Sequence, residues 1–172
     1  VIWLYEPINP YILAQWNKLY GMTLDIDEPL VVLDIDILLM HDYMELINYP
    51  VKKGQFLSIQ AWWKQTANPN YNLQGGFLKY YPKDCRYIYD KFMKDPSYWQ
   101  KYYIKNGVTV GPINGEQYFV EDSVKERLEL IWAPTEWIGV MKDSSREWEA
   151  YINSIYPGDW YFLGGEYHPD IK

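Results

Sequence analysis

Two aspartates, Asp34 and Asp36, are the residues of this sequence best placed for chemistry. They follow four apolar residues, Leu30–Leu33, a pattern typical of a strand buried on both faces of a parallel sheet. Side chains two positions apart in an extended chain point to the same side, and open α/β sheets bind ligands beyond the carboxyl ends of such strands. Adjacent carboxylates repel each other unless a cation lies between them, and divalent cations prefer oxygen ligands. The segment therefore predicts a divalent metal site that could also neutralise a bound diphosphate.

The same tripeptide occurs earlier in the chain in a different context. Asp25-Ile26-Asp27 lies in a polar connection and is followed by Glu28-Pro29, with no apolar strand before it. We interpret this copy as a solvated loop. For Asp34 and Asp36, the residues alone leave a metal role and a structural role equally open.

The alternation of apolar and polar segments indicates which elements must position the aspartates. Helix starts are marked by Asn9-Pro10, by Asp95-Pro96 and by the Ser144/Glu147 capping box. We expect strands at 1–5, 30–33, 55–60, 73–81, 129–132 and from 160, and helices at 9–21, 42–47, 82–93, 95–104, 115–122 and 144–155. Strands that alternate with helices predict an α/β sandwich with a mixed sheet.

Composition excludes several classes of protein. The 172 residues are the size of one domain and carry 16 Lys+Arg against 23 Asp+Glu, without a basic block, so we expect no nucleic-acid partner. No run approaches the roughly 18 apolar residues of a membrane span. The single cysteine, Cys85, can form neither an internal disulfide nor a cysteine metal cluster. With no signal-peptide pattern in view, we expect a cytoplasmic location.

The segment Leu33–Leu46 resembles the metal-binding segment of the GT-A glycosyltransferases. The likeness is to the family 8 type, which uses nucleotide-sugar donors and has Asp-x-Asp, an Asp six positions on and a Leu four further, as at Asp36, Asp42 and Leu46. The resemblance implies a GT-A-like α/β/α sandwich with a mixed, mainly parallel central sheet. The many tyrosines also give the chain the look of small virus-encoded transferases that decorate capsid proteins, which would place it in the host-cell cytoplasm.

Four further segments resemble family motifs and follow in the family's order. They are the Lys/Trp-bearing helix at Trp16–Leu19, the Asn-x-Gly strand at Asn72–Phe77, the Gly-Asp-Gln segment at Gly115–Gln117, and the late His at Gly164–His168 with Lys172 behind it. Three details depart from the family pattern: the Asn72-to-Gly spacing is one residue longer, Glu116 replaces an Asp, and Lys172 follows His168 more closely.

The resemblance implies metal ligands at Asp34, Asp36 and His168, holding Mn²⁺ or Mg²⁺. It also implies that the nucleotide-sugar donor, a UDP-sugar, contacts Asp34 and further residues: Gly75, Gly76, Gln117 and Lys172. The double glycine has two explanations from the residues alone, close approach of a ligand to the backbone and a β-bulge.

Glu116 and Asp122 are the candidate catalytic residues. Glu116 could be the base that deprotonates an acceptor hydroxyl, or it could orient the sugar, or it could be a helix N-terminal acid that interacts with the dipole. Asp122 is an alternative base. Inversion or retention at the anomeric carbon is not readable from these residues.

The function implied is transfer of a sugar from a nucleotide diphosphate to a hydroxyl of a glycan or glycoprotein acceptor. Only 33 residues precede Asp34, so we expect either a very small member of the family or a chain that lacks part of the N-terminal nucleotide-binding unit. Two alternatives stay open: a Mg²⁺-dependent phosphatase of the haloacid dehalogenase type, which also uses Asp-x-Asp, and a non-catalytic glycan-binding module that uses its aromatic residues.

Overall fold

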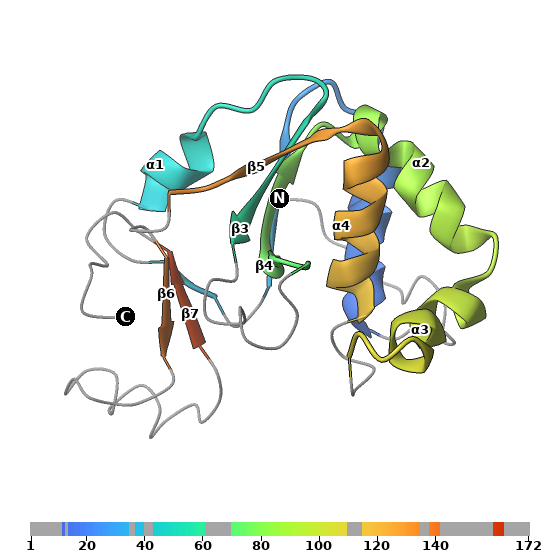
Figure 1. Ribbon diagram of the computed structural model, residues 1–172. Helices are drawn as coiled ribbons and strands as arrows, with labels where there is room; N and C mark the ends of the chain where they lie inside the picture. Colours follow the sequence, from blue (N-terminus) through green and yellow to red (C-terminus); the bar gives the residue numbers. More distant parts are fainter. Residues whose placement is uncertain are drawn as a thin grey trace.

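The computed structural model describes residue 12 and residues 14–34, 37–39, 43–60, 70–109, 115–134, 138–141 and 160–163. Within these residues the chain forms a four-stranded sheet, a three-stranded sheet and a group of helices packed on the larger sheet (Figure 1). No helix of this part is long and apolar enough to cross a membrane.

The four-stranded sheet has the order β1-β4-β3-β5. Its strands are β1 (Leu30–Leu33), β3 (Gln55–Gln60), β4 (Leu73–Tyr80) and β5 (Glu129–Trp132). β4 runs antiparallel to both of its neighbours, while β3 and β5 pair in parallel. All eight residues of β4 are buried, so this strand forms the centre of the described fold.

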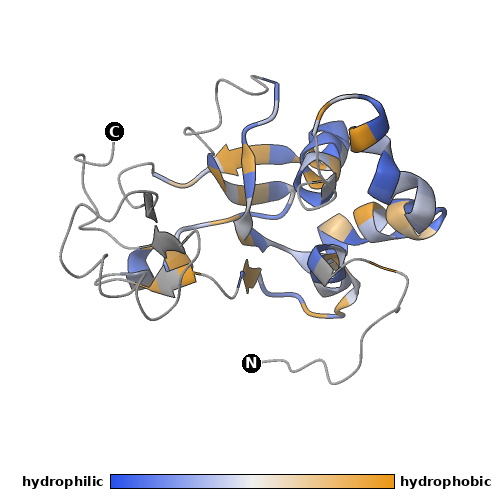
Figure 2. Cartoon of the chain, turned by 90° about the horizontal axis from the view of Figure 1, so that it is seen from below, coloured by the Kyte–Doolittle hydropathy of each residue, from blue (hydrophilic) through white to orange (hydrophobic). Residues whose placement is uncertain are grey.

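The two faces of this sheet pack into two separate clusters, because side chains alternate along a strand. One face, with Phe56, Leu78 and Tyr80, packs against η1 (Ala14–Thr23), α2 (Pro82–Met93) and α4 (Gly115–Arg127), with α3 (Pro96–Lys105) contributing Tyr103. The other face packs against α1 (Tyr43–Asn48), as its cluster shows: Leu46, Val51, Leu57, Ile59, Phe77 and Ala133. Apolar colour accordingly concentrates on the sheet and on parts of the helices in Figure 2.

The other described strands form a three-stranded sheet of order β2-β7-β6. Its strands are β2 (Ile37–Leu39), β6 (Ile138–Met141) and β7 (Trp160–Leu163); β7 pairs in parallel with β2 and antiparallel with β6. Ile37, which starts β2, packs on the α1 side of the larger sheet. The chain therefore passes from one sheet to the other through the segment that contains both aspartates.

Most predicted elements form where the sequence places them. β3, β5 and α2 match the predicted bounds, β4 and α3 match them to within one residue, and a strand begins at Trp160. The mixed sheet and the α/β class are confirmed. Expected elements at 1–5 and 144–155, and the first residues of the helix expected at 9–21, lie outside the described residues.

Three expectations about individual elements were wrong. β1 is half-buried and pairs antiparallel with β4, so it is not a strand buried on both faces of a parallel sheet, and two of the three pairings in this sheet are antiparallel. η1 continues past Gly21 to Thr23. A Cβ at Gly21 would lie 2.7 Å from the Tyr80 hydroxyl and 2.9 Å from Leu30 Cδ2, so this glycine lets η1 approach the sheet and does not end the helix. α4 extends beyond the predicted residue 122 to Arg127, and its additional residues include the buried Val124. The strands β2 and β6 were not predicted from the sequence.

Candidate functional site

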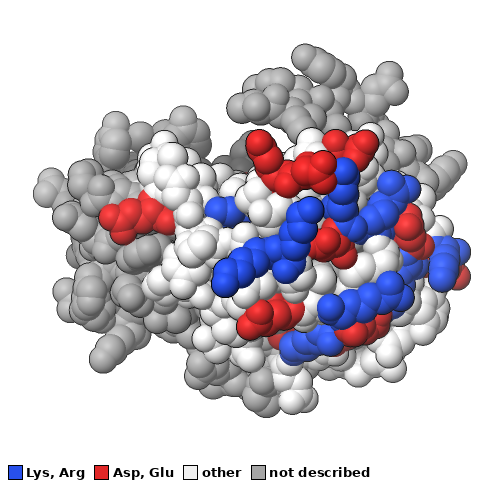
Figure 3. All heavy atoms as spheres, turned by 90° about the horizontal axis from the view of Figure 1, so that it is seen from above, with Lys and Arg blue, Asp and Glu red and all other residues white. Residues whose placement is uncertain are grey.

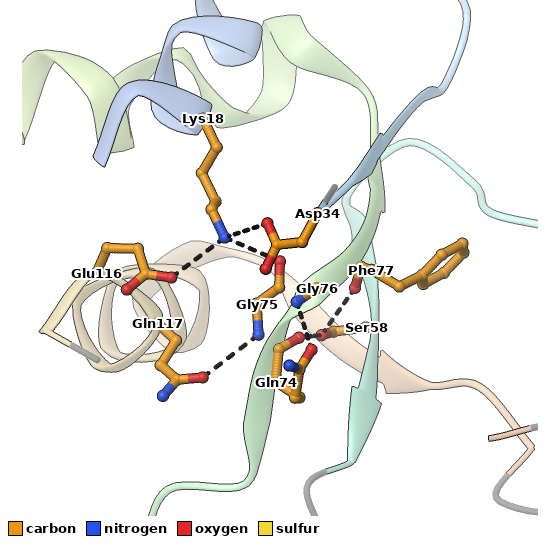
Figure 4. A network of polar contacts seen from close by, with 9 residues as sticks. All are labelled: Lys18, Asp34, Ser58, Gln74, Gly75, Gly76, Phe77, Glu116 and Gln117. Atoms are coloured by element: carbon orange, nitrogen blue, oxygen red, sulfur yellow. Dashed lines mark hydrogen bonds and ion pairs between the residues drawn. The ribbon is translucent and has the colours of Figure 1, made fainter. Parts of the chain in front are cut away.

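The ammonium group of Lys18 joins three segments that are far apart in the sequence. Its Nζ lies 2.8 Å from Asp34 Oδ1, 3.3 Å from Glu116 Oε1 and 3.1 Å from the carbonyl oxygen of Gly75 (Figure 4). Lys18 belongs to η1, Asp34 follows β1, Gly75 lies in β4, and Glu116 lies in the first turn of α4. The structure thus brings Asp34, Gly75 and Glu116, all predicted site residues, together around one lysine.

Packing of η1 and α4 determines where Lys18 and Glu116 lie. Trp16, 1% exposed, stacks on Phe92 of α2 with ring centroids 4.7 Å apart, which anchors η1. A Cβ at Gly115 would lie 3.2 Å from Trp16 Cζ2, closer than most side chains tolerate. The glycine therefore allows the first residue of α4 to contact η1, and Glu116 comes within reach of Lys18.

The charges in this cluster are buried to different degrees. The side chains of Lys18 and Glu116 are 11% and 6% exposed, whereas that of Asp34 is 33% exposed. Burial lowers the pKa of Lys18, but the carboxylates of Glu116 and Asp34 outweigh this effect and raise it above 10.5. Burial raises the pKa of Glu116, and the nearby ammonium opposes that rise only in part. At neutral pH, Lys18 is therefore a fixed cation between two acidic groups.

Within the described part of the chain, one carboxylate oxygen of Glu116 has no hydrogen-bond donor. Oε1 pairs with Lys18, while Oε2 is buried and receives no hydrogen bond from any described residue. A buried acceptor in this state is costly unless a ligand or a water supplies the missing hydrogen bond. Oε2 therefore marks a place where a hydroxyl or amine donor would be stabilised.

A bulge in β4 sets the direction of the Gly75 peptide. Ser58 of β3 pairs with Leu78, whereas the next residue, Ile59, pairs with Gln74, so the three residues Gly75–Phe77 have no opposite residues on β3. Of the two explanations for the double glycine, the bulge is therefore present in the structure. Bulges commonly re-aim backbone groups next to functional sites.

Polar groups of nearby residues form hydrogen bonds with the backbone of this bulge. The Ser58 hydroxyl lies 3.1 Å from the Gln74 carbonyl oxygen and 3.2 Å from that of Phe77. The amide of Gly76 donates to the side-chain oxygen of Gln74, and its carbonyl accepts from the amide of Asp34 at 2.9 Å. The bulge is consequently connected directly to the aspartate segment.

Both glycines face atoms that a side chain would displace. A Cβ at Gly75 would lie 2.8 Å from Glu116 Oε1 and 3.1 Å from Lys18 Nζ. A Cβ at Gly76 would lie 2.7 Å from Gln74 Oε1. The Gly75 amide also lies 3.4 Å from Oε1 of Gln117, so this predicted donor-site residue belongs to the same cluster.

Asp122 lies in a different cluster. Its Oδ2 accepts hydrogen bonds from the hydroxyls of Tyr71, at 3.0 Å, and Tyr103, at 2.7 Å. Six residues along α4 carry it about 9 Å from Glu116 and to another side of the helix. The described contacts thus give Asp122 a place in a tyrosine network and none beside Lys18.

The other predicted site residues, Asp36, His168 and Lys172, lie outside the described residues. Among the described residues no three His, Cys, Asp or Glu side chains converge in a way that could hold a metal ion. Asp34 suits a hard divalent cation by its oxygen chemistry and its partial exposure, although Lys18 already contacts its Oδ1. The metal site predicted at Asp34, Asp36 and His168 therefore stays a prediction.

The earlier Asp-x-Asp copy is a surface feature, as predicted. The side chains of Asp25 and Asp27 are 91% and 72% exposed, and both pair with Lys83 at 3.0 and 2.9 Å. Figure 3 shows acidic and basic side chains intermingled over one face of the molecule. The described ion pairs also include Arg86–Asp90 and Lys91–Glu126.

Lys18 is the site residue that sequence reasoning left without a role. The segment Trp16–Leu19 was singled out only by resemblance, and nothing in the local pattern distinguishes a buried lysine from a solvated one. Comparison with known proteins found no family model, no curated protein and no solved structure that matches this chain.

Proposed function

We propose that this chain is a metal-dependent glycosyltransferase of the GT-A type that transfers a sugar from a nucleotide diphosphate, a UDP-sugar, to an acceptor hydroxyl. One observation carries the proposal. Three segments chosen by their resemblance to family motifs, around Lys18, Gly75 and Glu116, meet beside Asp34 although 16 to 98 positions separate them from it or from each other. A set of coincidental matches would have no physical reason to converge.

The cluster offers groups suited to a sugar. Oε2 of Glu116 is a buried acceptor that a sugar hydroxyl could satisfy, and the Asp34 carboxylate is open to solvent on one side. The ion pair with Lys18 holds the Glu116 side chain in a fixed position, which favours an orienting role over that of a mobile base. A divalent cation, Mn²⁺ or Mg²⁺, would neutralise the diphosphate as it leaves.

Thermal unfolding with Mn²⁺ alone, UDP alone and both together tests the proposal. A ligand at a hundred times its Kd stabilises the folded state by about 2.7 kcal/mol, which for a chain of this size raises Tm by roughly 5–10 °C. We expect this shift only with metal and UDP together. A phosphatase would respond to Mg²⁺ with phosphate analogues, and a glycan-binding module would not respond to nucleotide.

Matched variants assign the shift to the predicted aspartates. Asp36→Ala and Asp34→Asn should abolish the metal-dependent shift, while Asp27→Ala, in the exposed copy of the tripeptide, should keep it. Equal losses from Asp27→Ala and Asp36→Ala would show that the shift does not come from the predicted pair. Release of UDP from a UDP-sugar by the wild-type chain provides an independent readout of transfer or hydrolysis.

A further inference from the structure

We infer that Ser58 is a positioning residue, whose buried hydroxyl holds the β4 bulge in the shape that presents the Gly75 peptide to Lys18. Ser58 contacts neither Lys18 nor the acidic groups, and its side chain is fully buried (0% exposed). The role of Ser58 in a donor site rests on the proposed function. Its effect on the shape of the bulge does not depend on that function.

The position of Ser58 in the sheet supports this inference. The register between β3 and β4 shifts between Ser58 and Ile59, so Ser58 is the last residue in regular pairing before the bulge. Its hydroxyl proton is shared between the carbonyl oxygens of Gln74 and Phe77, the residues on either side of the two glycines. The hydroxyl thus spans the bulge from one end to the other (Figure 4).

Loss of this hydroxyl should raise the free energy of the bulged conformation. Two buried carbonyl groups would lose their donor, and a buried acceptor without a partner is unfavourable. Regular pairing of β4 with β3 would then compete with the bulge, and a shift in register turns backbone and side-chain groups toward the opposite face. The Gly75 carbonyl would leave Lys18, and with it the arrangement around Glu116 Oε2 would change.

The chain offers a control with the same chemistry. Ser123 on α4 is also fully buried, and its hydroxyl lies 3.3 Å from Lys91 Nζ, in a part of the core that does not touch the bulge. Ser123→Ala therefore removes a buried hydroxyl without affecting β4. At position 58, threonine and valine have the same shape, so the difference between Ser58→Thr and Ser58→Val isolates the hydroxyl from the effect of added volume.

Amide hydrogen exchange tests the inference without any ligand. In Ser58→Ala and Ser58→Val, the amides of Gly75 and Gly76 should exchange at least about tenfold faster, relative to the Leu57 and Tyr80 amides of the same variant, because a hydrogen-bonded constraint on the bulge is lost. Ser58→Thr and Ser123→Ala should keep the wild-type ratio. Equal ratios in the threonine and valine variants, or an equal change in Ser123→Ala, would overturn the inference.

Kinetics then separate a failure of this inference from a failure of the proposed function. If the wild-type chain turns over a UDP-sugar, Ser58→Ala should lower kcat by about ten- to a hundredfold through misplacement of the groups around the sugar. Its affinity for UDP alone should stay within about twofold, since UDP lacks that sugar. An unchanged kcat would overturn the role in the donor site. A wild-type chain that ignores nucleotide would refute the proposed function, and the exchange ratios alone would then decide the role of Ser58.

Discussion

Replacement of Lys18 by methionine measures how strongly the fold depends on this buried ammonium group. Methionine keeps an unbranched side chain, but the Glu116 carboxylate, 6% exposed, loses its counter-charge. Removal of one partner from a buried ion pair typically costs about 3–5 kcal/mol, because the other charge remains buried and unpaired. The Asp34 side of the cluster is 33% exposed and screened by solvent, so we expect about 3 kcal/mol, the lower end of that range, near pH 8.

The destabilisation caused by Lys18→Met should depend on pH, and the pKa shifts determine the direction of this dependence. The pKa of Glu116 is already raised above its ordinary value of 4.5 by burial, and loss of Lys18 raises it further. The folded variant therefore binds a proton that the unfolded chain releases above pH 4.5, and its stability falls as the pH rises through the raised pKa. The destabilisation relative to wild type should consequently be small at about pH 5 and large at about pH 8.

At alkaline pH the stability difference between wild type and Lys18→Met should become smaller again. The pKa of Lys18 is raised above 10.5, so the stabilisation that it provides is complete below 10.5 and is lost as the pH rises through the raised pKa. The methionine variant has no such group to titrate. The curve of the stability difference against pH should therefore have a maximum between the two titrations.

Urea unfolding of wild type, Lys18→Met, Glu116→Gln and the double variant gives the measurement. Glu116→Gln should cost about 1 kcal/mol or less, because Lys18 keeps Asp34 and the Gly75 carbonyl while a carboxylate that burial disfavours is removed. The double variant should be more stable than the sum of the single effects predicts, since no unpaired buried charge remains. A Lys18→Met cost that is the same at about pH 5 and about pH 8, or additive single effects, would refute this account of the cluster.

Two further predictions concern the packing around the sheet. Gly21→Ala should destabilise the chain by about 1–3 kcal/mol in urea unfolding, because the added Cβ meets the Tyr80 hydroxyl and Leu30; an unchanged midpoint would show that η1 does not press against β4. The Cys85 thiol is fully buried and its pKa is raised, so a thiol reagent should label it only after the chain unfolds; rapid labelling of the folded chain at neutral pH would contradict the buried position of Cys85.

Local sequence pattern determined the elements whose signals are short-range. Pro82 and Asp95-Pro96 mark the starts of α2 and α3, where proline suits the first helical turn and Asp95 accepts a hydrogen bond from the Tyr98 amide. The solvated character of Asp25–Asp27 was also readable, because exposure leaves a direct mark on residue type. The list of site segments came from resemblance, and the metal, the donor and the reaction that it implies stay predictions.

Tertiary structure decided the relations between these elements. The pairing of β1 with β4 depends on contacts across more than 40 positions, so no local pattern could show that β1 is half-buried and antiparallel. The role of Gly21 comes from Tyr80 on another element, and the bulge at Gly75 comes from its register with Ser58. Lys18 reads locally as an ordinary helical lysine; only folding surrounds its ammonium group with Asp34, Gly75 and Glu116, since electrostatic partners are chosen by position in space and not by position in the chain.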